Sequence, residues 1–463
     1  MTKKQIAVLY MAMATSFATT FMGSSLNLSV PSIGKEMMVS ASQLGFVVTS
    51  YILVMAAFAV PFGRMGDQTG RKKLLVAGLM LFAITSLFSA FSDDFPHLIL
   101  LRAIQGISAA MIFSSNMPIL LSNFPFSMRG RVLGLSTAAT YAGLSLGPVL
   151  GGIMNHYLGW RSIFVATFIF TLPALIVAMS ALPKDDVENF RENKNLFDIP
   201  GNVLYVMTIL SLIYGFTVVK DNSFAGFLIL LGVLSFFAFV TTEKKAENPL
   251  IKVTLFTQNR TFAFSNIAAM LNYGATFAIG YLLSIYLQVI MGYSSQAAGL
   301  IMIAQPIIMM VLSPISGRMS DKVSACRLAS IGMAFCALGL VFFVFIDENT
   351  HLAFIIAGLA VTGIGFGFFS SPNTNAVMSS VGAEEHGVAS SVLTTMRSVG
   401  HASGMAMVTV IMATYMGKQA LTEVPQSLLV FVIQRIFLIC IIVCVLGIFF
   451  SLGRIKDKSN PKC

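Results

Sequence analysis

One short polar segment lies between two long apolar runs near the N-terminus, and its side chains could do chemistry. Residues 63–73, GRMGDQTGRKK, contain one carboxylate, Asp67, together with four cations, and the apolar runs 44–62 and 74–92 flank them. Cations hold such a loop on the cytoplasmic face of a membrane, whereas acidic residues contribute little to topology. Asp67 therefore needs another role, and the three glycines of the segment would let the loop turn tightly.

The same pattern occurs a second time. The stretch PFGRMGDQ at residues 61–68 returns as PISGRMSDK at residues 314–322, which places Asp321 254 positions after Asp67. A second echo links GLSLG at residues 143–147 to GHASG at residues 400–404, at an offset of 257. Two echoes at nearly one offset indicate a duplicated bundle. Internal duplication in a chain with many spans is typical of transporters, whose halves move about a site between them.

The composition identifies the bilayer as the solvent of this chain. Of the 463 residues, 56% are hydrophobic and only 10% are charged, and a soluble protein could not bury so much apolar surface. Apolar runs of about 18 residues or more predict membrane spans. They fall at residues 6–28, 44–63, 74–92, 97–120, 132–154, 162–182, 199–219, 224–242, 262–290, 296–317, 325–346, 352–374, 388–415 and 428–452. The sequence thus predicts an all-α integral membrane protein with 14 transmembrane helices and both termini in the cytoplasm.

The charges support this orientation. Of the 29 Lys and Arg residues, 22 fall in the predicted cytoplasmic segments and three inside spans, and only four fall in external loops: Lys35, Arg161, Lys220 and Lys418. The pI of about 9.4 then reflects anchoring at the inner face, and nucleic-acid binding is not needed to explain it. The first span is too long for the apolar part of a signal peptide, so we expect it to remain uncleaved.

The repeat also divides the chain. Spans 2 and 5 echo in spans 10 and 13, so spans 9–14 repeat spans 1–6, and spans 7 and 8 have no counterpart. We predict a six-helix bundle at residues 1–183, a linker with the inserted spans 7 and 8 at residues 184–260, and a second six-helix bundle at residues 261–463. Residues 184–194 mix both charge signs, which predicts a solvated linker.

Span 4 carries a polar stripe. Arg102, Gln105 and Asn116 share one helical face, because the step from the first to the last falls only about 40° short of four full turns. Arginine in hydrocarbon costs several kcal/mol unless it faces a polar interior. The stripe therefore predicts a cavity lining, and the alternative is that Arg102 snorkels to the outer interface nearby.

The second half of the chain carries its own polar residues near mid-membrane. Arg397 and His401 lie one turn apart in span 13, and His401 is either a proton carrier or a hydrogen-bonding partner. Asn272, Tyr273 and Gln305 are candidates for the cavity. None of the 19 Asp and Glu residues lies inside a predicted span, although an exporter of organic cations usually needs a buried carboxylate.

Span 5 contains a row of small residues and a proline: Gly143, Gly147, Pro148, Gly151 and Gly152. Small residues four apart permit close contact between helices, and proline removes a backbone hydrogen bond. The row predicts tight packing, and it also suits a hinge or seal between the bundles. The five cysteines form no CxxC pair, and we predict no metal site.

These motifs together resemble the major facilitator superfamily and, within it, the fourteen-span drug:proton antiporter family, over the whole length of the chain. The matching positions are Gly63, Asp67, Gly70, Arg71 and Lys72 of the first loop, Arg102, Gln105 and Gly106 of span 4, and the five span-5 residues given above. The end of span 1 departs from the family pattern. Met22 stands where the family has an aspartate, whereas Asn27 is retained.

The resemblance implies a secondary-active exporter in the cell membrane that moves amphipathic drugs or other small molecules against an influx of protons, by alternating access. It implies no cofactor beyond the proton gradient, and we expect a monomer in the lipid bilayer. Asp67 would close a gate by latching onto the cytoplasmic start of span 13. The predicted gate and coupling residues are Asp67, Arg71, Arg102, Arg397 and His401. The predicted cavity residues are Met22, Asn27, Gln105, Asn116, Asn272, Tyr273 and Gln305.

Three other functions compete with this one. Because Met22 replaces the acid, the alternative within transport is an exporter of one endogenous metabolite or lipid, or an anion-tolerant porter, with non-standard coupling. A membrane-embedded enzyme such as a lipid transferase would need a metal cluster or paired acid and base residues in the membrane, and the sequence has neither HExxH nor such pairs. A sensor would need a soluble output domain, which the short loops do not supply. We therefore predict that the chain is not an enzyme.

Overall fold

The structure is a computed structural model that describes residues 1–124, 126–182, 198–218, 224–246, 249–250, 253–320, 323–382, 386–417, 421 and 424–454. These residues form helices joined by short turns, and no strand occurs among them. Thirteen helical segments of the described chain are long and apolar enough to cross a membrane. The 33-residue helix Phe126–Leu158 is not among the thirteen, so the count of fourteen stays a prediction.

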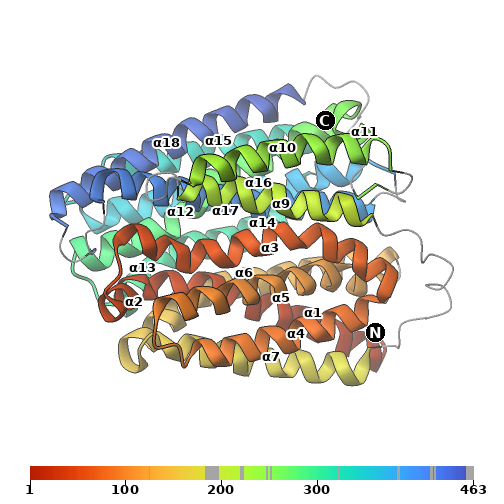
Figure 1. The fold of residues 1–463 in the computed structure, drawn as a ribbon, viewed down its shortest axis with the longest axis horizontal. Coiled ribbons are helices and arrows are strands. Elements are labelled where there is room, and N and C mark those ends of the chain that lie inside the picture. Colours follow the sequence, from red (N-terminus) through yellow and green to blue (C-terminus); the bar gives the residue numbers. More distant parts are fainter. Residues whose placement is uncertain are drawn as a thin grey trace.

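The first half of the chain forms one group of helices, which we call the first bundle and which fills the lower half of Figure 1. In it α1 packs against α6 and α7, and α5 packs against α3 and α4. Its elements are α1 (Lys3–Ser25), the 3₁₀ turn η1 (Leu26–Ser29), α2 (Val30–Met37), α3 (Ala41–Thr69), α4 (Arg71–Ser89), α5 (Phe95–Ser122), α6 (Phe126–Leu158) and α7 (Arg161–Ala181).

The second half forms the second bundle, in the upper half of Figure 1. Here α12 packs against α17 and α18, and α16 packs against α14 and α15. Its elements are α12 (Arg260–Ile285), the π-helix η2 (Tyr286–Ile290), α13 (Ser295–Met302), α14 (Ala304–Met319), α15 (Ala325–Val344), α16 (Leu352–Ser379), α17 (His386–Met416) and α18 (Gln426–Gly453).

Two further helices, α9 (Ile199–Thr217) and α10 (Ala225–Glu243), pack against each other. α9 also contacts α3 of the first bundle and α17 of the second, so this pair lies beside the place where the bundles meet. The short helix α11 (Thr254–Thr257) leads into α12. The predicted linker at residues 184–194 lies outside the described residues.

Prolines decide where two of the long helices change geometry. Pro306 has no N–H to offer the carbonyl of Met302, and α13 ends at that residue before α14 continues the span. Pro31 likewise leaves the carbonyl of Asn27 without its helical partner, and the 3₁₀ turn η1 lies there. The first and tenth predicted spans are thus more broken than their apolar runs indicated.

The polar segment at residues 63–73 differs from the loop that its composition predicted. It is not a loop, because α3 continues through Gly63 and Gly66 to Thr69 and α4 begins at Arg71. The whole turn is made at Gly70, whose φ of 106° suits glycine. The side chain of Asp67 lies outside the part of the chain that the structure describes.

The helices have two ends, which we name by the glycines in their turns. The Gly159 end holds the turns after α2, α4, α6 and η2, and the Gly70 end holds the turn between α3 and α4. α1 begins at the Gly70 end, where the amide of Gln5 donates to the carbonyl of Asn123 after α5 (3.2 Å). α18 ends there too, because Gly453 lies against the start of α12 at Arg260.

Candidate functional site

A group of polar and aromatic side chains lies where α12, α16 and α17 of the second bundle meet. We call it the Arg397 cluster: Tyr273, Phe277, Ser370, Thr374, Arg397 and His401. Gly274, Gly400 and Gly404 let α12 and α17 approach closely. A β-carbon at Gly400 would lie 2.3 Å from the carbonyl oxygen of Met270, and one at Gly404 would lie 2.2 Å from the carbonyl oxygen of Gly274. Helical spacing of four residues then places Tyr273 beside Phe277 and Arg397 beside His401.

Arg397 is held from one side only. Its Nη2 donates to the Thr374 hydroxyl at 2.6 Å, and its guanidinium carbon lies 5.3 Å from the centre of the Tyr273 ring. The Tyr273 hydroxyl in turn lies 3.2 Å from that of Ser370. The Nε of Arg397 is buried and has no hydrogen-bond partner, although the side chain as a whole is only half-buried.

His401 belongs to the aromatic part of the cluster. Its ring stacks on Phe277 with 4.3 Å between centroids and meets Tyr273 edge-on at 5.2 Å. Tyr273, Phe277 and His401 are all half-buried. The cluster therefore offers a surface of aromatic rings next to a fixed positive charge.

The first bundle reaches this cluster through Tyr141 of α6. Its hydroxyl lies 3.4 Å from that of Ser313 on α14, and it interacts electrostatically with Tyr273 and Arg397. Sequence reasoning missed Tyr141, Ser313 and Ser370. The one signal for Tyr141 was its place two residues before Gly143, at the start of the glycine row.

The arginine of the first bundle has different surroundings. Arg102 is 1% exposed, and its Nε donates to the carbonyl of Val47 at 3.0 Å. Its Nη1 donates to Gln105, whose own amide donates to Ser86 at 2.7 Å, and its guanidinium covers the Tyr51 ring at 4.4 Å. In this conformation Arg102 neither lines a space between the bundles nor snorkels to an interface, because α3, α4 and α5 of the same bundle supply the partners of Arg102 and Gln105.

Most of the other predicted cavity residues also face helices of their own bundle. Met22 is fully buried, and its sulfur accepts from the Thr167 hydroxyl at 3.1 Å. Asn116 donates to the carbonyl of Ala12 at 3.3 Å, and Asn272 is fully buried beside Cys444. Of the predicted set, Tyr273 and Gln305 are half-buried. Arg71 opens α4 and stands apart from the Arg397 cluster in sequence and fold.

Asn27 lies in a hydrogen-bonded network that joins the bundles at the Gly159 end. The Ser284 hydroxyl donates at 2.7 Å to the carbonyl of Asn27, which is the carbonyl that Pro31 leaves without a helical partner. Gln288 of the π-helix donates to the carbonyl of Leu28 at 3.2 Å. From the first bundle, Asn155 donates to the Ser295 hydroxyl at 2.7 Å. We call this network the clasp: Asn27, Leu28, Asn155, Ser284, Gln288 and Ser295.

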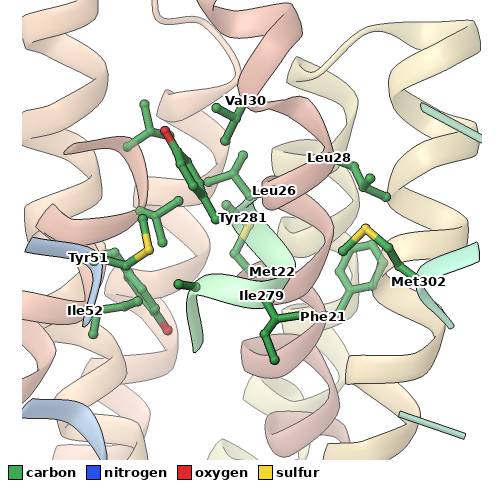
Figure 2. Packing of buried hydrophobic residues seen from close by; sticks show 14 of the residues in the cluster. Phe21, Met22, Leu26, Leu28, Val30, Tyr51, Ile52, Ile279, Tyr281 and Met302 are labelled. Atoms are coloured by element: carbon green, nitrogen blue, oxygen red, sulfur yellow. The ribbon is translucent and has the colours of Figure 1, made fainter. Parts of the chain in front are cut away.

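Apolar packing surrounds the clasp. Figure 2 shows Leu26 and Val30 of the first bundle near Tyr281 of α12, and Leu28 near Met302 of α13. All of these side chains belong to one buried cluster. The bundles are therefore closed against each other at the Gly159 end by apolar contacts as well as hydrogen bonds.

The glycine row of α6 serves two contacts. A β-carbon at Gly143, Gly147 or Gly151 would collide with Thr20, Ser24 or Ser25 of α1, respectively, which is packing within the first bundle. On the other side of α6, the carbonyl of Pro148 lies against Gly299 and the β-carbon of an alanine at Gly152 would lie 2.3 Å from the carbonyl of Ser295. The row thus packs α6 against both α1 and α13, and whether it also acts as a hinge stays a prediction.

The contact between α6 and α13 has a counterpart. Gly45 of α3 lies against Thr409 of α17 as closely as Gly299 of α13 lies against Pro148 of α6. Gly45 and Gly299 are separated by the same 254 positions as Asp67 and Asp321. The duplicated halves therefore meet through two equivalent pairs of helices.

Comparison with known proteins gives the fold and the sequence context of this site. The family model described as Major Facilitator Superfamily matches residues 12–405 and 265–462. The chain is 29% identical to the riboflavin transporter RibZ of Clostridioides difficile over 99% of both chains. It is 26% identical to the multidrug resistance protein Stp of Mycobacterium tuberculosis, over 84% of this chain and 73% of that protein.

Solved structures share the architecture at low identity. The POT family transporter PepTSo superimposes with a TM-score of 0.71 at 13% identity, covering 99% of both chains. A bacterial homologue of the human lysosomal transporter Spinster superimposes with a TM-score of 0.67 at 14% identity, covering 98% of this chain and 97% of that one. These likenesses concern the fold.

Proposed function

The chain belongs to the Major Facilitator Superfamily, and on that premise we propose that it carries planar aromatic small molecules across the cell membrane by secondary-active, proton-coupled alternating access. One observation carries this proposal: the Arg397 cluster, a half-buried group of three rings and a cation, is met by Tyr141 from the other bundle. Transporters of this kind bind their cargo between two halves that move against each other.

Two features support an aromatic cargo. Aromatic rings attract other rings in stacked or edge-on arrangements, and Tyr273, Phe277 and His401 keep part of their surface exposed. A riboflavin transporter is among the relatives, and riboflavin is a planar tricycle. It is therefore the first compound to test.

A second candidate is efflux of amphipathic drugs by proton antiport. The relatives named as multidrug resistance proteins favour it. The absence of Asp and Glu from the predicted span interiors argues against organic cations as its preferred cargo, because a buried carboxylate is what attracts them. Export and import use the same fold, so the direction must be measured.

Coupling and gating are proposed for three residues. His401 would carry a proton, since it is the titratable ring in the cluster, and His401→Gln should leave downhill exchange intact while abolishing accumulation on an imposed pH gradient. Accumulation by the variant at the rate of the unaltered protein would exclude this role.

Asp67 and Arg71 would form the latch at the Gly70 end, which the positive charge around them marks as cytoplasmic. Asp67→Asn keeps the shape of the side chain and all of the cations, so we expect normal insertion and lost transport. Normal transport in that variant would remove the latch from the proposal.

The experiment that tests the function uses purified protein in proteoliposomes with an imposed pH gradient of either sign. Uptake of riboflavin, of the anion fluorescein and of the cation ethidium is followed by fluorescence. We expect gradient-driven movement of riboflavin or fluorescein that dissipating the gradient abolishes. If proteoliposomes take up all three compounds no faster than protein-free liposomes do, the proposed function is refuted.

A further inference from the structure

Arg102, Arg397 and Arg454 are buried or half-buried within or just after long helices, and their hydrogen bonding differs. Arg454, after α18, is fully buried, and its guanidinium donates to Ser265 (2.7 Å), Asn373 (2.6 Å) and both oxygens of Ser451 (3.1 and 2.8 Å). Arg102 donates to Val47 and Gln105 within its own bundle. These two cations are satisfied by the protein.

Arg397 differs from these two, and among the described arginines it shares a buried Nε without a partner only with Arg64, near the end of α3. Of its donors, Nη2 reaches Thr374, and the buried Nε has no partner among the described residues. No acidic side chain is in contact with it in that part of the chain, and the sequence offers none in the interior of a predicted span. A guanidinium group stays charged in proteins, and an unpaired charge shielded from water is costly unless something compensates it. A donor without an acceptor, inside a transporter and next to exposed rings, indicates that the acceptor comes with the cargo.

We propose that Arg397 forms a subsite for an anionic oxygen group, such as a carboxylate or a deprotonated imide, on the planar molecule that this protein carries. This inference rests on the proposed function and names the charge class of its cargo. The guanidinium holds the anionic edge through Nε, and Thr374 fixes its orientation by accepting from Nη2. The planar body of the cargo lies along the rings of Tyr273, Phe277 and His401.

Tyr141 completes the subsite from the first bundle. Its hydroxyl pairs with Ser313 and interacts with Tyr273 and Arg397, so its position depends on how α6 lies against the second bundle. An anion at Arg397 would therefore lie in the second bundle, close to where Tyr141 of the first bundle pairs with Ser313. Binding there favours the conformation in which the two halves meet around it.

The test measures binding of three tricyclic probes that differ in charge to the purified protein: fluorescein (anion), riboflavin (neutral) and ethidium (cation). Arg397→Gln removes the charge, and Arg397→Lys keeps the charge but lacks the planar fork. The matched control is Arg435→Gln on α18, whose arginine is exposed and lies over Phe431 at 4.8 Å. Thr374→Val is a milder second variant, in case Arg397→Gln does not fold.

We expect Arg397→Gln to weaken fluorescein binding about tenfold or more, because it removes a hydrogen bond between charged groups. Ethidium binding should be unchanged or tighter, and Arg397→Lys should recover only part of the loss. Thr374→Val should weaken fluorescein binding by about threefold or more and leave ethidium binding unchanged. Arg435→Gln should bind all three probes as the unaltered protein does.

Two results in Arg397→Gln would overturn the anionic subsite and leave the proposed function standing: an equal loss of binding for all three probes, or no loss of fluorescein binding. If Arg397→Gln does not fold, the same two results in Thr374→Val decide the matter. If the unaltered protein binds and transports none of the three, the proposed function fails, and the subsite fails with it.

Discussion

Arg102 and Arg397 both interrupt apolar helices, and the two regions that contain them do different work. The donors of Arg102 find a carbonyl of α3, the amide of Gln105 and the ring of Tyr51 inside the first bundle. Arg397 donates to the hydroxyl of one threonine, Thr374, and its side chain is only half-buried. From this difference we expect Arg102 to act as an anchor, because its own bundle supplies its acceptors, and the proposed subsite gives Arg397 a role in binding.

The largest expected effect is on stability. Arg102→Ala removes the donor to the Val47 carbonyl and to the Gln105 amide oxygen, and it opens a void. The free energy of unfolding should therefore fall by about 3 kcal/mol or more. Arg397→Ala should change it by less than about 1.5 kcal/mol and affect transport instead. Thermal unfolding of the purified proteins in detergent measures both. Equal destabilisation by the two substitutions would make Arg397 a second anchor.

The next effect concerns the contact between the bundles. A β-carbon at Gly299 would lie 2.1 Å from the carbonyl oxygen of Pro148, so Gly299→Leu should hold α6 and α13 apart and reduce transport to about a tenth or less. The matched control is Gly23→Leu in α1, where nothing lies within 4 Å of a built β-carbon.

Size-exclusion chromatography of both glycine variants checks that they remain folded. Full transport by Gly299→Leu would mean that this contact is not used in the cycle.

The smallest effect belongs to the clasp. Ser284→Ala leaves the carbonyl of Asn27 unsatisfied, which costs about 1–3 kcal/mol where the group is buried. The Gly159 end should then open more often, and a cysteine introduced by Ser32→Cys should react faster with a membrane-impermeant maleimide. The control is Ser180→Ala, whose hydroxyl bonds to Ile176 one turn away in the same helix. If both serine variants label at the same rate, apolar packing alone closes this end.

The helical positions of the polar residues could be predicted from the sequence, and their neighbours could not. Arg102, Gln105 and Asn116 do share one face, and all three are buried. Their spacing could not say whether that face meets another helix or a space, because both environments tolerate polar groups that find partners. The carbonyl that accepts from the Nε of Arg102 belongs to Val47 on α3, 55 residues away, and no helical period relates the two positions.

The polar segment at residues 63–73 teaches the same lesson about backbone. Its composition indicated a turn at the correct place in the chain, and three glycines could have made it. Only Gly70 takes a positive φ, because α3 remains hydrogen-bonded past the apolar run to Thr69. Glycine permits such a turn without requiring it.

By itself the sequence determined the solvent, the helical class and the duplication of this protein, because the lengths of apolar runs and the offsets between repeated stretches are properties of the chain alone. Asn27 and Ser284 illustrate both sides. They are 257 positions apart, which is the offset between GLSLG and GHASG, so the sequence already made them counterparts. Only the tertiary structure decided that these counterparts touch, and that Tyr141 of one half meets Ser313 of the other. The angle and depth at which two bundles pack depend on the side chains of many helices at once, and no local stretch of sequence contains them.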